Sequence, residues 1–171
     1  MMRIGLAMGS NLGDRGRQLA TARDALRVLI GPQEDFRQAP LFATAPVDCP
    51  PGSPDFINTA LEFDLAGDDL PGFLRACQQI EARMGRPLPK DRHRNAARPI
   101  DLDLLYLAGA THTSPDLILP HPRLARRRFV LEPLACIAPE RIPGGHVMTI
   151  AAMLAALPPG DPALRRIADE W

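Results

Sequence analysis

The sequence has no excess of charge of either sign: its 171 residues include 20 arginines and lysines and 20 acidic residues, so the formal net charge is zero. A chain without net charge has no overall field to attract nucleic acid or anionic lipid, and any cationic site must be local. Lysine is nearly absent, since Lys90 is the single one. In such an arginine-biased composition, only a cluster of arginines indicates phosphate binding.

Cysteine is scarce, and its spacing is uninformative. Cys49, Cys77 and Cys136 are far apart, and no CxxC or Cys/His pattern links them. A disulfide framework and a zinc site are therefore not expected. Cys77 and Cys136 fall within apolar patterns and are expected to be small buried hydrophobic residues.

The chain also lacks an apolar run as long as a membrane span, and no signal-peptide core follows Met1. We therefore expect a cytoplasmic protein. Neither GxGxxG nor GxxxxGK[ST] occurs, which argues against a dinucleotide fold and a P-loop enzyme. The glycines at 9 and 13 are expected only to allow a tight turn. The length and the apolar fraction of 46% suit one domain over 1–171.

What the chain does contain is a regular succession of strand and helix patterns. Strands are predicted at 3–9, 35–44, 56–64 and 100–107, and helices at 15–30, 69–84, 129–137 and 149–157. The first six elements have the order typical of the split βαβ, ferredoxin-like fold. We expect an α+β sandwich with one mostly antiparallel sheet and helices packed on one face. Four prolines within 46–54 predict a stiff surface loop. The last dozen residues give no clear pattern.

The most informative stretch is the apolar, β-prone run 98–107. Asp101 and Asp103 lie two apart in it, so on a strand both carboxylates point to one face, with Leu102 and Leu104 opposite. Paired carboxylates on a largely buried strand repel each other and lose hydration. A hard divalent cation would relieve both penalties, and Mg²⁺ is usual where phosphates are bound. The alternative is a strand at the sheet edge with a wet outer face.

A run of cations precedes this strand. It consists of Arg86, Lys90, Arg92, Arg94 and Arg98, with Asp91 the only acid among them. A carboxylate pair for metal beside a cationic loop is the combination that transfer of a phosphorylated group requires. Gln78 and Glu81 lie on one face of the predicted helix that leads into this loop. A second basic cluster follows between 120 and 128.

In their order, these motifs resemble the 6-hydroxymethyl-7,8-dihydropterin pyrophosphokinases of folate biosynthesis. The resemblance extends from Gly9 to about Pro139. Its strongest marks are Arg-x-Ile-Asp-Leu-Asp-Leu-Leu at 98–105, Pro-His-Pro-Arg at 120–123 and Arg-x-Phe-Val-Leu-x-Pro-Leu at 127–134. Thr-x-Pro at 44–46 and Pro-Asp-Phe-Ile-Asn at 54–58 add to it. The departures lie in the cationic loop, where Ala96-Ala97 replaces a common Gly-Pro and Leu88 replaces a common arginine.

The resemblance implies that the β,γ-pyrophosphoryl group of ATP is transferred to the hydroxymethyl oxygen of the pterin, with release of AMP. ATP would be the co-substrate, and two Mg²⁺ ions held by Asp101 and Asp103 would bridge its phosphates. Arg86 and Arg98 would clamp the phosphates, because a planar guanidinium meets two phosphate oxygens at once. These four residues form the catalytic set that the resemblance implies, and no protein general base is recognisable.

The resemblance also implies two sets of binding residues. ATP would contact Gln78, Glu81, Arg94, Arg98, Leu104, His121 and Arg127. The pterin would contact Thr44, Ala45, Val47, Phe56, Asn58 and Phe129, with the two phenylalanines on either side of the flat ring. Plainer interpretations of the same residues stay open: core packing for Phe56 and Phe129, turns for His121 and Asn58, and an intrahelical ion pair for Glu81.

Two other functions also stay open. The altered loop at 86–98 favours a catalytically weak pterin- or nucleotide-binding protein. The split βαβ fold also hosts RNA-binding modules, but the expected sheet lacks their aromatic pattern. We therefore expect small-molecule partners, ATP and a dihydropterin, and neither nucleic acid nor a membrane. The oligomeric state is open, a monomer being the simplest expectation.

Overall fold

The computed structural model describes residues 1–32, 34–46, 50–87, 96–159 and 164–171. Its strands are β1 (Met2–Ser10), β2 (Arg37–Gln38), β3 (Leu41–Thr44), β4 (Phe56–Leu65), β5 (Asp101–Leu107), β6 (His112–Thr113), β7 (Ile118–Leu119) and β8 (Arg165–Ala168). Its helices are α1 (Arg15–Ile30), α2 (Leu70–Arg83), α3 (Arg128–Ile137) and α4 (Ile150–Ala155), with a 3-10 turn η2 (Leu124–Arg126) before α3. None of the described helices is both long and apolar enough to span a bilayer.

The main sheet has the order β5-β1-β4-β3-β8, with β2 also paired to β4, and β6 and β7 form a separate pair. All of these pairs are antiparallel. The two longest strands, β1 and β4, lie side by side in the middle, and β5 lies at one edge. The predicted α+β architecture with an antiparallel sheet is confirmed.

The first helical layer forms as its sequence pattern predicts. The Asp14 carboxylate accepts a hydrogen bond from the Arg17 N–H at the start of α1, and Asp69 accepts one from Gly72 N–H in the same way in α2. The apolar stripes of both helices then cover one face of the sheet. The core on this face includes Leu19 and Leu26 of α1, Phe73 and Cys77 of α2, Ile4, Leu6 and Met8 of β1, and Leu102 and Leu104 of β5.

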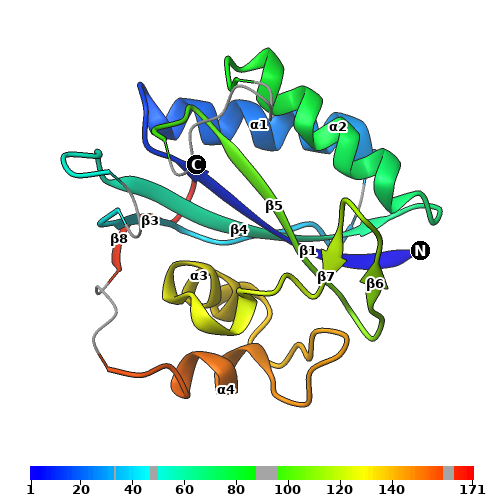
Figure 1. Ribbon diagram of the computed structural model, residues 1–171. Coiled ribbons are helices and arrows are strands. Elements are labelled where there is room, and N and C mark those ends of the chain that lie inside the picture. The colour runs from blue at the N-terminus through cyan, green and yellow to red at the C-terminus, as the bar shows by residue number, and fades with distance from the viewer. Residues whose placement is uncertain (33, 47–49, 88–95, 160–163) are drawn as a thin grey trace.

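The expectation that helices lie on one face only is wrong. In Figure 1, α1 and α2 lie above the sheet, and α3 and α4 lie below it. The second core combines Val130, Leu131 and Leu134 of α3, Ile150 and Met153 of α4, and Leu105 and Tyr106 of β5. With both faces covered, nearly every residue of β4 is buried, and this explains its imperfect alternation.

Two further expectations are corrected by the structure, and one segment without a prediction is placed. The predicted strand at 35–44 is divided into β2 and β3 around Ala39 and Pro40. Between them, the Ala39 N–H donates a hydrogen bond to the Ala60 carbonyl, and the Ala39 carbonyl accepts one from the Thr59 hydroxyl. Cys136 is exposed, because α3 turns the opposite face to the second core, whereas Cys77 is buried as expected. The last residues form β8 at the β3 edge.

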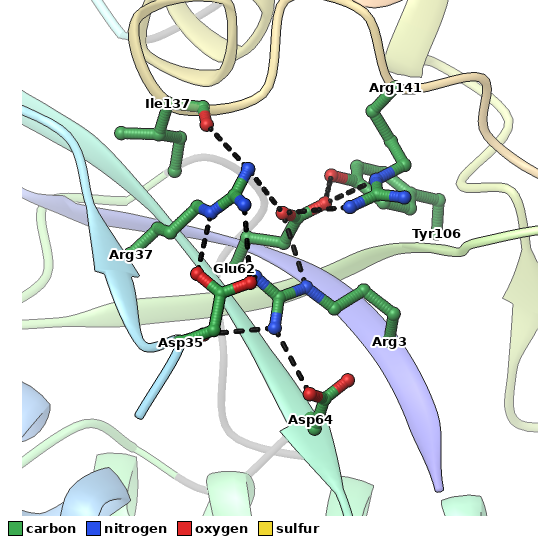
Figure 2. Close-up of polar contacts among 8 residues, drawn as sticks. All are labelled: Arg3, Asp35, Arg37, Glu62, Asp64, Tyr106, Ile137 and Arg141. Atoms are coloured by element: carbon green, nitrogen blue, oxygen red, sulfur yellow. Dashed lines mark hydrogen bonds and ion pairs between the residues drawn. The ribbon is translucent and has the colours of Figure 1, made fainter. Parts of the chain in front are cut away.

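A buried ion-pair cluster joins the α3 and α4 layer to the sheet (Figure 2). At its centre is the Glu62 carboxylate of β4, which is 0% exposed. It interacts with Arg3, Arg37, Arg141 and the Tyr106 hydroxyl. Arg37 also donates to the carbonyl of Ile137, the last residue of α3. The Tyr106 ring lies directly over Gly5 of β1, where a Cβ would come within 2.2 Å of the ring.

Candidate active site

Several of the predicted site residues meet at one end of the neighbouring strands β5, β1 and β4. In the antiparallel register, Gly9 of β1 lies opposite Asn58 of β4 on one side and opposite Asp101 of β5 on the other. Ala7 lies opposite Asp103. Because directly opposed residues on antiparallel strands point to the same face, Asn58, Asp101 and Asp103 share a face of the sheet. That face is the one covered by α3, since Leu102 and Leu104 pack in the core on the other side.

The two carboxylates of β5 lie in different surroundings. The Asp101 side chain is 17% exposed, and that of Asp103 is 41% exposed. The edge position of β5 agrees with the alternative weighed from the sequence, but the face that carries the acids is lined by arginines. Arg98 Nη2 lies 2.8 Å from Asp101 Oδ2, and Arg86 Nη1 also contacts Asp101. Arg127 is the more distant partner of Asp103, at 3.9 Å.

Glu81 connects α2 to this edge strand. Its side chain is buried, and Oε1 accepts a hydrogen bond from the Leu102 N–H at 2.8 Å. The same oxygen contacts Arg86, which also contacts Asp101. Glu81 therefore binds the backbone and an arginine of this chain. Because Arg86 lies beyond the end of α2, this is not the intrahelical ion pair considered from the sequence.

The surroundings of the site shift the pKa values of Asp103, His121 and Arg127. Loss of hydration and the neighbouring Asp101 carboxylate raise the pKa of Asp103 to about 6, although Arg127 and Arg86 oppose this. Loss of hydration and the charges of Arg127 and Arg123 lower the pKa of His121 to about 4, so this imidazole is neutral at pH 7. Loss of hydration and the charge of Arg123 also lower the pKa of Arg127. Cations are therefore crowded beside Asp103.

The donor set suits Mg²⁺ that is shared with a substrate. Mg²⁺ is commonly bound through one or two carboxylates, with phosphate and water oxygens completing its shell. Asp101 and Asp103 supply two carboxylates on one face, and the raised pKa of Asp103 reflects loss of hydration and, after it, repulsion from Asp101, both of which a bound cation would offset. In the described ranges, no three His, Cys, Asp or Glu side chains form a metal-binding group by themselves. Phosphate oxygens would have to complete such a site.

On the other side of Gly9, the structure brings two predicted pterin residues together. The Asn58 carboxamide donates to the Thr44 hydroxyl at 2.7 Å, and both side chains are buried. Gly9 is what allows the Asn58 side chain to lie there, because a Cβ at this position would lie 2.7 Å from Asn58 Oδ1. Ala45 follows β3 and is exposed.

The two predicted ring-stacking residues each lie beside a guanidinium. The Arg98 guanidinium lies 5.1 Å from the centre of the Phe56 ring, and that of Arg127 lies 5.4 Å from the Phe129 ring. Flat cations favour the faces of aromatic rings for the same reason that flat heterocycles do. Phe56 is buried and Phe129 is half-buried at the start of α3.

The remaining predicted residues are placed less directly. Gln78 is exposed on α2. The Leu104 side chain is buried in the core beneath α1 and α2, so it does not line the site, and only its backbone remains for a contact with ATP. His121 accepts a hydrogen bond from the Arg123 N–H at 3.1 Å, as a turn residue does. Val47 and Arg94 lie outside the described residues.

Sequence reasoning missed two residues of this region. Gly9, the last residue of the first predicted strand, was expected only to allow a tight turn, but it lies within β1 under the Asn58 side chain. Its place in a predicted strand was the available signal, because a glycine inside a strand often marks a place where another group approaches the backbone closely. Asn11 was not singled out from the sequence, yet its side chain is bonded to Arg98 and Pro54.

Comparison with known proteins identifies the family of the chain. Residues 5–139 match the family model described as 7,8-dihydro-6-hydroxymethylpterin-pyrophosphokinase (HPPK). The chain is 37% identical over 162 residues to the 2-amino-4-hydroxy-6-hydroxymethyldihydropteridine pyrophosphokinase of Methylorubrum extorquens, covering 93% of this chain and 96% of that protein. It is 36% identical to the Pseudomonas aeruginosa protein of the same name, over 92% and 93% of the two chains.

Among solved structures, an HPPK-DHPS protein in complex with substrates superposes with a TM-score of 0.71 at 13% identity. The match covers 91% of this chain and 44% of that longer one, and at such low identity it speaks for the fold. The fold is therefore that of the ferredoxin-like pyrophosphokinases. Given the family match over most of its length and two full-length relatives, the chain belongs to the 7,8-dihydro-6-hydroxymethylpterin-pyrophosphokinase family.

Proposed function

We propose that this protein transfers the β,γ-pyrophosphoryl group of ATP to the hydroxymethyl oxygen of 6-hydroxymethyl-7,8-dihydropterin, releasing AMP, as a step of folate biosynthesis. The observation that supports this best is the pair of half-sites on either side of Gly9. One carries Asp101 and Asp103 on β5, and the other carries Asn58 on β4. Both strands neighbour β1, so about 10 Å separates them. That separation suits a triphosphate on one side and a flat ring on the other.

The acidic half-site would hold the nucleotide phosphates. Asp101 and Asp103 would bind two Mg²⁺ ions, which when bound neutralise phosphate charge and hold the phosphates in place. Arg86 and Arg98 now contact Asp101, and they would exchange this partner for phosphate oxygens when ATP is bound. Arg127, near Asp103, is a third cation available to the phosphates. The proposed nucleotide site would be completed by Gln78, Glu81, Arg94, Leu104 and His121.

The neutral half-site would hold the pterin. The Asn58 carboxamide, held by the Thr44 hydroxyl, would present donor and acceptor groups to the edge of the ring. Phe56 and Phe129 would cover its faces, with the Arg98 and Arg127 guanidiniums moving aside. Ala45 and Val47 would add wall contacts. Orienting the hydroxymethyl oxygen toward the β-phosphorus is the main catalytic contribution that these residues make.

A single assay distinguishes this proposal from an ordinary kinase and from a catalytically weak binding protein. The purified protein is incubated with ATP and Mg²⁺, with and without 6-hydroxymethyl-7,8-dihydropterin, and the nucleotide products are resolved. Release of AMP that depends on the pterin, with no ADP, supports pyrophosphoryl transfer. Loss of this AMP release when Mg²⁺ is chelated supports the proposed requirement for Mg²⁺. ADP would indicate an ordinary kinase instead. Pterin binding without any nucleotide product would favour the catalytically weak binding protein.

A further inference from the structure

We propose that Asn11 is a positioning residue that fixes the placement of the two half-sites relative to each other. The inference rests on the proposed function. Asn11 directly follows β1, at the end of the sheet where the site lies, and it is 1% exposed. A buried carboxamide has two donors and one acceptor oxygen to satisfy, so its partners reveal what it connects.

The first partner of Asn11 is the segment that leads into β5. Asn11 Oδ1 accepts a hydrogen bond from the Arg98 N–H at 2.8 Å, and the Asn11 N–H donates to the Arg98 carbonyl at 3.2 Å. Both backbone groups of Arg98 are thus held by one residue that is 87 positions away. Arg98 in turn contacts Asp101 through its side chain. Asn11 therefore fixes the beginning of the acidic half-site.

The second partner is the segment that leads into β4. Asn11 Nδ2 donates to the Pro54 carbonyl at 3.4 Å, and Pro54 precedes Phe56 by two residues. Arg15 of α1 holds the next carbonyl, that of Asp55, at 2.7 Å. Arg15 is thus a second tether of the pterin side, and this hydrogen bond holds only the segment before β4. The Asn11 side chain bonds to both segments.

This position matters because the reaction joins two substrates. The reacting atoms must approach to about 3–3.5 Å with their orbitals aligned, and a displacement of about 1 Å can cost about a hundred-fold in rate. A residue that holds only one half-site changes the binding of one substrate. A residue that fixes the two half-sites relative to each other lowers kcat while each substrate still binds. Asn11 belongs to the second kind.

The test compares Asn11→Ala with Arg15→Met as the matched control. We expect Asn11→Ala to lower kcat by at least about ten-fold, with each KM changed by less than about three-fold. Arg15→Met, which loses one tether on one side, should raise the KM for the pterin with kcat little changed. Thermal unfolding of both variants corrects for any loss of folded protein.

Hydrogen exchange of the substrate-free protein gives a readout that does not depend on activity. In Asn11→Ala, peptides covering 96–102 and 50–56 should both exchange faster, because Arg98 and Pro54 each lose a partner. In Arg15→Met, only 50–56 should exchange faster. If Asn11→Ala does not fold, Asn11→Asp replaces it: this variant keeps the acceptor for the Arg98 N–H and removes the donor to Pro54, so faster exchange is expected at 50–56 alone.

The outcomes separate the two proposals. Wild-type kcat in folded Asn11→Ala, or a loss explained entirely by KM or by unfolding, overturns the role of Asn11. Unchanged exchange in either segment overturns the link itself. A wild-type protein that releases no AMP refutes the proposed reaction, and in that case the exchange experiment alone decides whether Asn11 holds the two segments together.

Discussion

The Glu62 carboxylate accepts a hydrogen bond from Arg141 Nε at 2.7 Å, and this contact joins β4 to the segment between α3 and α4 (Figure 2). Glu62 is fully buried, and Arg3 and Arg37 lie 3.2 and 3.6 Å from its second oxygen. One carboxylate thus offsets charge from three arginines of separate segments. Since β4 also carries Asn58 and α3 carries Phe129, this cluster supports both walls of the proposed pterin site.

Replacing Glu62 by glutamine should strongly destabilise the protein. Removing one partner of a buried ion pair costs about 3–5 kcal/mol. We expect the lower end of that range, because Arg3 and Arg37 keep Asp35 as a partner and Arg141 is partly exposed. The measurement is the free energy of unfolding in denaturant at neutral pH. The control is Glu132→Gln, which removes an i,i+4 pair with Arg128 on the surface of α3 and should cost about 0.5 kcal/mol. Equal losses in the two variants would contradict a special role for Glu62.

The contribution of Glu62 should also depend on pH. Burial by itself raises the pKa of Glu62, but hydrogen bonds from Arg141 and Tyr106 and the charges of Arg141 and Arg3 outweigh it, so the pKa lies below the usual 4.5. A carboxylate with a lowered pKa in the folded state stabilises the protein above the unfolded value and loses this effect as pH falls through the folded value. The difference in unfolding free energy between wild type and Glu62→Gln should therefore be constant from about pH 7 to 5 and shrink below about 4.5. A difference that stays constant below that pH would rule out a lowered pKa.

Local periodicity was enough to predict most elements of the fold, because their apolar stripes are strong. It could not say which face of the sheet α3 would cover, since the apolar face of a helix looks the same whichever side it packs on. Nor could it reveal β8, whose residues are largely exposed and form a strand by pairing with the free edge of β3. Trp171 secures that segment through a hydrogen bond from its indole N–H to the Ala39 carbonyl at 2.9 Å, a contact between distant positions.

The site could be predicted where spacing alone decides geometry. Asp101 and Asp103 share a face because strands alternate, and this follows from any two residues that are two apart. The close approach of Asn58 to Gly9 depends instead on the register between β1 and β4, and no local pattern states that register. The same holds for Glu81, whose contact with the Leu102 N–H depends on how α2 lies along the edge of β5.

Replacing Gly9 by alanine should selectively impair pterin binding. The new Cβ would lie 2.7 Å from Asn58 Oδ1, so the carboxamide must move from its hydrogen bond with Thr44. Loss of one well-aligned hydrogen bond costs about 1 kcal/mol, so the KM for the pterin should rise about five- to ten-fold, with the KM for ATP unchanged. Gly16→Ala is the matched control, since its Cβ meets nothing closer than 3.9 Å. An equal rise in both KM values would show that Gly9 acts on the whole site.

Replacing Asp101 or Asp103 by asparagine should separate activity from stability. Each change removes a proposed Mg²⁺ ligand, and we expect pyrophosphoryl transfer to fall at least about a hundred-fold in both variants. Asp101→Asn should lower the melting temperature, because Arg98 loses a partner at 2.8 Å and Arg86 loses one as well.

Asp103→Asn should keep or raise the melting temperature, because Asp103 faces the Asp101 carboxylate and has Arg127 only at 3.9 Å. Melting is measured with and without Mg²⁺ and a non-hydrolysable ATP analogue, which should stabilise the wild type far more than either variant. Normal turnover in both variants would refute the metal site. A lower melting temperature in Asp103→Asn would mean that the Arg127 contact outweighs the repulsion between the acids. The acid pair would then be a stabilising feature of the fold, and not a place where stability is given up for phosphate chemistry.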